Sequence, residues 1–147
     1  IYPTYSDAVT CKGGLVAGLY QMDGNLDKLL EEFYGLLRAR HVGFLDQYMA
    51  YLNGQADRNK LIQFYHRAGF QLLAEELQNY PLALQYLNYG IQIAPNNTQL
   101  LLDLASIYLA MGQYNNAIQM SQRGLQLQAG NASFNRILQE ASRLQSN

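Results

Sequence analysis

A repeat of 34 residues constrains the fold of this chain more than any other feature of its sequence. When the segment Asn79–Asn97 is shifted by 34 residues, it lies on Gln113–Asn131 and many of its residues recur. The identical pairs include Tyr80 and Tyr114, Ala83 and Ala117, Gln85 and Gln119, Gly90 and Gly124, and Gln92 and Gln126. A period of this length, with helical patterns on both sides of a short turn, is typical of stacked helical hairpins. We therefore predict an all-α fold.

The unit Thr98–Asn131 shows the helical hairpin most clearly. Apolar residues at i, i+3, i+4 and i+7 form a stripe on its first helix, and a facing stripe on its second helix follows a break at Gly112. The first stripe consists of Leu101, Leu104, Ala105 and Tyr108, and the second of Tyr114, Ala117, Ile118, Ser121 and Leu125. We expect the small side chains of Ala105 and Ala117 to let the two helices pack closely.

These residues resemble the tetratricopeptide repeat family. The residues that match the family pattern at its offsets are Leu101, Leu104-Ala105, Tyr108, Gly112, Tyr114 and Ala117. Ser121 stands where the family usually has an aromatic residue, and Ala129 replaces its terminal Pro. The resemblance is strongest over residues 64–131 and weaker over residues 7–40. It implies a right-handed superhelical array of antiparallel helix hairpins, which is a tetratricopeptide-like solenoid.

The repeat also suggests how the rest of the chain is organised. We predict a single helical-repeat domain over residues 1–147, in which residues 64–131 form two repeats and residues 6–63 form divergent hairpins. Within those hairpins we predict helices near Ser6–Met22, Asn25–Arg40 and Phe44–Leu52. Residues 132–147 are predicted to form a capping helix, whose apolar stripe is Phe134, Ile137, Leu138, Ala141 and Leu144.

Residues 56–79 allow two interpretations. A continuous apolar stripe that crosses Gly69 favours one long helix, whereas regular repeat spacing favours two short helices that break there.

Charge and hydropathy exclude several classes of partner. The formal net charge is -1, only 14% of the residues are charged, and the ten Lys and Arg residues are scattered. Because binding to nucleic acid requires clustered positive charge, we expect no nucleic-acid partner. We also expect no membrane insertion, since no apolar run approaches the ~20 residues that span a bilayer. Because the chain begins at Ile1 without an initiator Met or a signal peptide, we expect its start to be either a truncation point or a processed end.

No set of residues has the pattern of an active site or a metal site. Cys11 could in principle pair with His41 or His66, but none of the three lies in a recognisable catalytic motif. The two histidines lack the i, i+4 spacing of a helical zinc site. Neighbouring side chains on a helix point about 100° apart, so the acidic pairs Glu31-Glu32 and Glu75-Glu76 diverge. We predict no catalytic residue, no metal and no cofactor.

The resemblance also implies a place where a partner binds. In the family, the first helix of each repeat lines a concave groove. The groove positions in this sequence are Tyr65, Ala68, Leu72, Glu75 and Glu76 in one repeat, and Gln99, Leu102, Ser106, Leu109 and Ala110 in the next. Leu102, Ser106 and Leu109 disfavour the recognition of a C-terminal carboxylate by basic groove residues. We expect a protein or peptide with apolar anchors instead.

These observations predict an interaction scaffold that binds a protein or peptide in the groove. A second copy of the chain could also fill the groove, so a homo-oligomer is possible. The alternative function is that of an accessory C-terminal domain in a larger enzyme or membrane protein whose upstream part is absent from this sequence.

Overall fold

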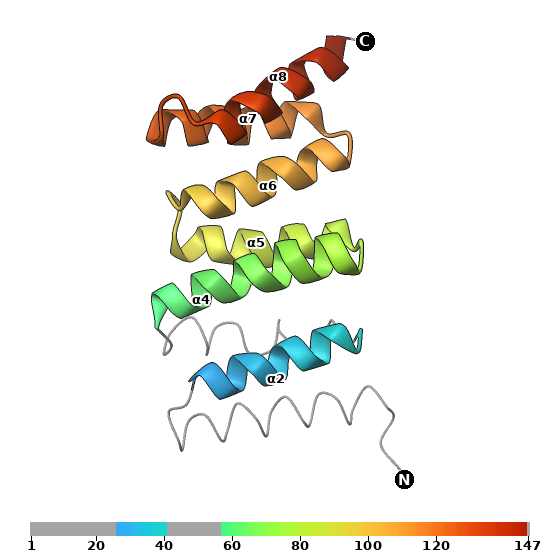
Figure 1. Cartoon of the computed structure of the whole chain (residues 1–147), viewed down its shortest axis with the longest axis vertical. Coiled ribbons are helices and arrows are strands. Elements are labelled where there is room, and N and C mark those ends of the chain that lie inside the picture. Colours follow the sequence, from blue (N-terminus) through green and yellow to red (C-terminus); the bar gives the residue numbers. More distant parts are fainter. Residues whose placement is uncertain (1–25, 41–56, 147) are drawn as a thin grey trace. The chain divides into compact units, whose positions relative to one another are not determined.

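The computed structural model describes residues 26–40 and 57–146, and these residues form helices and connecting turns without a strand (Figure 1). The helices are α2 (Leu26–Arg38), α4 (Arg58–Tyr65), the π-helix η1 (His66–Glu76), α5 (Tyr80–Ile93), α6 (Thr98–Ala110), α7 (Tyr114–Leu127) and α8 (Ala132–Ser146). The all-α prediction is therefore confirmed. The helices predicted near Ser6–Met22 and Phe44–Leu52 lie outside the described residues.

The described residues belong to two compact units, which meet in the chain between Phe64 and Tyr65. In the first unit, the buried rings of Phe33 and Phe64 lie 6.4 Å apart between their centroids. The ring of Tyr34 lies 5.2 Å from that of Phe64. The exposed side chains of Asp27 and Lys60 form an ion pair with a distance of 3.0 Å. These contacts join α2 to α4 along its length, from Lys60 to Phe64.

The helix around Gly69 is continuous. Residues 58–76 are helical without interruption, first as α4 and then as η1, so the interpretation as one long helix is confirmed. The end of η1 keeps the wide turn of a π-helix, because the backbone N–H of Leu77 donates to the carbonyl of Leu72 at 2.9 Å. Gly69 is buried, and a Cβ atom there would lie 2.9 Å from Cγ of Leu87 on α5. A glycine within the helix thus allows α5 to pack closely against η1.

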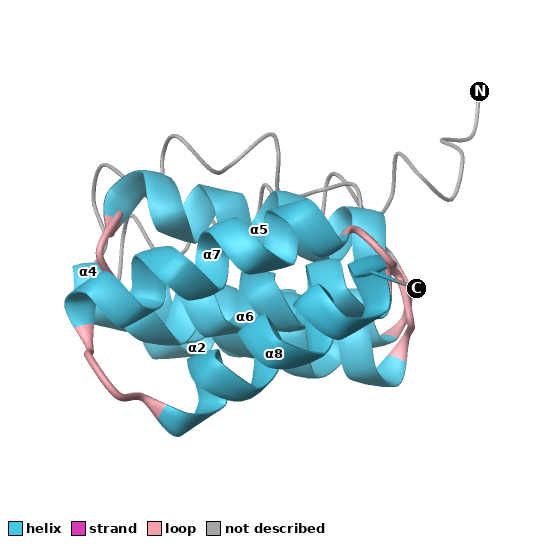
Figure 2. Ribbon diagram, turned by 90° about the horizontal axis from the view of Figure 1, so that it is seen from above, coloured by secondary structure: helices cyan, strands magenta, loops and turns pink. Residues whose placement is uncertain are grey.

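The second unit is built from successive helix pairs. η1 packs against α5, and α6 packs against α7, while α6 also contacts η1 on one side and α8 on the other. Figure 1 shows neighbouring helices from α5 to α8 running in alternating directions, and Figure 2 shows α5 and α7 on one side of this unit with α6 and α8 on the other. The first helices of consecutive repeats therefore form one layer.

Equivalent residues of the 34-residue repeat occupy equivalent positions in the helices. Tyr80 and Tyr114 are the first residues of α5 and α7, and Ala83 and Ala117 have no exposed surface. The buried cluster Ala105, Ala117, Ile137 and Ala141 joins α6, α7 and α8. As expected, the small side chains of Ala105 and Ala117 are buried where α6 and α7 pack together.

The ends of the helices repeat as well. The side chain of Asn97 accepts a hydrogen bond from the N–H of Leu100 at 3.0 Å, and that of Asn131 accepts one from Phe134 at 3.1 Å. Both asparagines cap the first helix of a repeat. Gly112 has a φ of +77°, a conformation that favours glycine, and it follows the end of α6 as the sequence predicts.

Candidate binding groove

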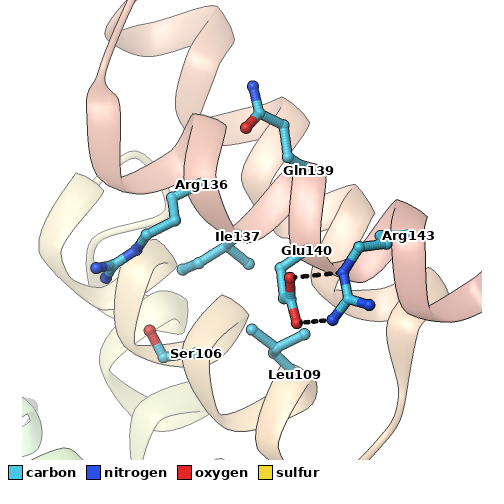
Figure 3. Close-up of a pocket in the computed structure, with 7 residues that line it drawn as sticks. All are labelled: Ser106, Leu109, Arg136, Ile137, Gln139, Glu140 and Arg143. Atoms are coloured by element: carbon cyan, nitrogen blue, oxygen red, sulfur yellow. Dashed lines mark hydrogen bonds and ion pairs between the residues drawn. The ribbon is translucent and has the colours of Figure 1, made fainter.

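A groove of about 560 Å³ lies between α6 and α8 (Figure 3). Ser106 and Leu109 line it from α6, and the residues that line it from α8 are Arg136, Ile137, Gln139, Glu140 and Arg143. Because α6 and α8 are the first helices of consecutive repeats, the 34-residue period brings their equivalent faces together. We call this feature the α6–α8 groove.

The floor of the α6–α8 groove is apolar. Ile137 belongs to the buried cluster and is only 4% exposed, while Leu109 is half-buried and packs against the same cluster. The hydroxyl of Ser106 donates a hydrogen bond to the carbonyl of Leu102 at 2.8 Å, so its proton is already used within α6. Ile137 is therefore the buried base of the groove, and the half-buried Leu109 presents apolar surface to it.

Charged side chains of α8 form the rim. Nε and Nη2 of Arg143 donate to the two carboxylate oxygens of Glu140 at 3.1 and 2.6 Å. These hydrogen bonds hold the pKa of Glu140 below its usual range. Arg136 is exposed and has no ion-pair partner among residues 26–40 and 57–146. The rim thus contains the ion pair between Glu140 and Arg143, whose charges cancel, and the unpaired cation of Arg136.

Only two of the ten groove residues predicted from the sequence line the α6–α8 groove. Ser106 and Leu109 line the α6–α8 groove, and Leu102 packs nearby as a half-buried side chain of the core cluster. Glu75, Glu76, Gln99 and Ala110 are exposed but do not line it. Tyr65, Ala68 and Leu72 are at most 3% exposed, so they offer a partner almost no surface.

The sequence prediction did not include the contribution of α8 to the groove. The repeat itself contains the signal, because adding 34 to Leu102, Ser106 and Leu109 gives Arg136, Glu140 and Arg143. The sequence predicts the C-terminal helix only as a cap. In the structure, the same helix forms one wall of the groove.

A buried acidic residue connects η1 to α6. Asp103 is 1% exposed, and its Oδ2 lies 2.5 Å from Nδ1 of His66. The side-chain amide of Gln99 donates to Oδ1 of Asp103 at 3.0 Å. The hydrogen bond to Asp103 raises the pKa of His66. Burial raises the pKa of Asp103 against the opposing effect of its hydrogen bonds.

The His66–Asp103 contact holds the first helices of two repeats together, and no pattern in the sequence predicts it. The two residues are 37 positions apart, and Asp103 matches no family position that we identified. Within the part of the chain that the structure describes, no group of three or more His, Cys, Asp or Glu residues could hold a metal ion. Cys11 and His41 lie outside that part. None of the described helices is both long and apolar enough to cross a membrane.

Comparison with known protein families identifies a segment that contains all of the groove-lining residues except Arg143. Residues 74–141 match the family model of the tetratricopeptide repeat, which confirms the resemblance seen in the sequence. The match includes α5, α6, α7 and the groove-lining part of α8 up to Glu140. No curated protein matches the chain. Tetratricopeptide repeats generally mediate protein–protein interaction and are typically non-catalytic scaffolds.

Proposed function

Because residues 74–141 form a tetratricopeptide-repeat segment, we propose that the chain is an interaction scaffold that binds a protein or peptide in the α6–α8 groove. The observation that carries the proposal is the groove itself, which joins an apolar floor to a polar rim between the first helices of two repeats. Binding sites commonly combine apolar surface for affinity with a few polar groups that fix orientation.

The proposed contact surface contains the accessible residues predicted on α6 together with the facing side of α8. Leu109 would receive an apolar side chain of the partner above the buried Ile137. Gln99, Leu102 and Ala110 would extend the surface along α6, and Glu75 and Glu76 would provide an acidic edge on η1. The buried side chains of Tyr65, Ala68 and Leu72 would support the groove from beneath.

The proposal applies equally if the chain is the accessory C-terminal domain of a larger enzyme or membrane protein. The groove is formed by α6 and α8, which belong to the same compact unit, so both functions would use the same surface.

A peptide selection tests the proposed function. A displayed library of random 12-residue peptides is selected on the full chain, and the enriched peptides are synthesised and titrated. We expect Ser106→Lys and Leu109→Lys to abolish most binding, because each places a charged side chain in the apolar groove. Gln126→Lys, at an exposed position on α7, adds the same charge outside the groove and is the control.

Circular dichroism would show that each variant keeps its helices. Enriched peptides that bind the Ser106→Lys and Leu109→Lys variants as tightly as the unmodified chain would contradict the proposal. The same conclusion would follow if no peptide were enriched.

A further inference from the structure

We infer that the partner places an acidic side chain against Arg136, next to the apolar residue that occupies the α6–α8 groove. This inference rests on the proposed function and adds the charge of the partner to it. The observations behind it are the ion pair between Glu140 and Arg143 on α8, the net charge of the groove lining and the direction of its polar side chains.

Arg136 is the one lining cation without a carboxylate partner among the described residues. Glu140 lies four residues after Arg136, a spacing at which the two side chains could pair on a helix. In the structure, both carboxylate oxygens of Glu140 accept hydrogen bonds from Arg143 instead. Figure 3 shows Arg136 on the opposite side of Ile137 from this pair. Its guanidinium therefore keeps its donors for a ligand.

The net charge of the residues that line the groove also favours an acidic ligand. Arg136 and Arg143 contribute two positive charges and Glu140 one negative charge, so the lining has a net charge of +1. The whole chain, by contrast, has a formal net charge of -1. The acidic residues Glu75 and Glu76 of η1 do not line this groove. A ligand with a carboxylate is therefore complementary to this surface.

An acidic side chain fits the groove better than the carboxylate of a chain end. A C-terminus is usually captured by several donors that converge on its oxygens. Here Arg143 donates to Glu140, and the hydroxyl of Ser106 donates to the carbonyl of Leu102. Figure 3 shows the amide of Gln139 directed away from Leu109 and Ile137. A single guanidinium above an apolar floor matches one Asp or Glu beside an apolar residue.

The test uses the peptides enriched on the full chain from the 12-residue library. Each peptide is synthesised in three forms: as selected, with its Asp or Glu changed to Asn or Gln, and with its C-terminus amidated. Binding is measured to the unmodified chain, to Arg136→Gln and to Arg58→Gln. Arg58 is exposed on α4, so Arg58→Gln changes the net charge equally outside the groove.

We expect Arg136→Gln to weaken binding of the acidic peptide about two- to fivefold, the range typical of an exposed ion pair, and to leave the neutral form unchanged. Arg58→Gln should change the binding of neither the acidic nor the neutral peptide. Arg136→Glu should restore binding to a peptide in which Lys replaces the acidic residue. Higher salt should weaken only the acidic form.

Equal binding of the acidic and neutral forms would overturn the inference. A loss of binding that follows amidation of the C-terminus would also overturn it, because the ligand carboxylate would then be the chain end. In either case the inference fails, but the proposed function stands if the same peptides bind the Ser106→Lys variant more weakly than the unmodified chain. If they bind that variant as tightly, the proposed function fails as well.

Discussion

Gly124 packs directly against the ring of Phe134, so that a Cβ atom at Gly124 would lie 2.3 Å from Cζ of the ring. The same relationship occurs one repeat earlier, where a Cβ atom at Gly90 would lie 2.9 Å from Cδ1 of Leu100. In both places a glycine of the second helix receives a large side chain from the next first helix. This contact fixes how closely successive repeats pack, and it positions the beginning of α8, which forms one wall of the groove.

Gly124→Ala is expected to destabilise the protein by about 1–3 kcal/mol, because the added methyl group must displace a buried ring. The steric cost outweighs the gain of about 1 kcal/mol that Ala gives over Gly within a helix. Urea denaturation would measure the change. At Gly35 of α2 a Cβ atom meets nothing within 4 Å, so Gly35→Ala is the matched control and should stabilise. In a Phe134→Leu background the cost of Gly124→Ala should fall. Equal stability of Gly124→Ala and the unmodified chain would contradict the prediction.

Ser121→Ala is expected to stabilise the protein by about 1 kcal/mol, because it removes a buried hydroxyl that forms no hydrogen bond. Ser121 has no exposed surface, and its Oγ has no hydrogen-bond partner among the described residues. Ala is also the better helix former. Thermal unfolding would detect a higher Tm, and Ser142→Ala at an exposed position of α8 provides the comparison. A Tm lowered by Ser121→Ala, with no change for Ser142→Ala, would show that the hydroxyl is stabilising.

The stability of the protein should decrease as the pH rises through the folded-state pKa of His66. Asp103 raises the pKa of His66 above its ordinary value of 6.5, so the folded protein holds a proton that the unfolded chain releases. The His66–Asp103 contact contributes fully to the free energy of unfolding below the pKa of His66 in the unfolded chain. This contribution is lost as the pH rises above the pKa of His66 in the folded protein. Burial opposes the ionisation of Asp103 and raises its pKa, so stability also decreases as the pH rises through the pKa of Asp103 in the folded protein.

An NMR titration of the His66 ring, together with urea denaturation at a series of pH values, would measure this linkage. Asp103→Asn keeps the size of the side chain and removes its charge, so it should lower the pKa of His66 and flatten the pH dependence above 6.5. The other groups that bear on His66 are Glu75, which raises its pKa, and burial, which lowers it. A pKa of His66 that does not change in Asp103→Asn would exclude this mechanism.

The helices of residues 80–146 could be read from the sequence because their signals are local. Apolar residues at i, i+3 and i+4 mark the buried face of each helix, and Gly112 marks the end of α6. The family match over residues 74–141 confirms the repeat. The period of 34 residues could also have predicted that α8 lines the groove, because equivalent residues of stacked repeats face the same side.

Only the tertiary structure decided which polar residues pair and which stay accessible. Asp103 looks like a surface residue in the sequence, but η1 buries it and brings His66 within 2.5 Å. Glu140 could pair with Arg136 or Arg143 on α8, and the folded structure selects Arg143, which leaves Arg136 free to meet a partner. Periodicity is a property of one helix and therefore specifies where each helix forms and which side it buries. Pairing depends on the distance and relative orientation of side chains from different turns and helices, which are fixed only when the helices pack.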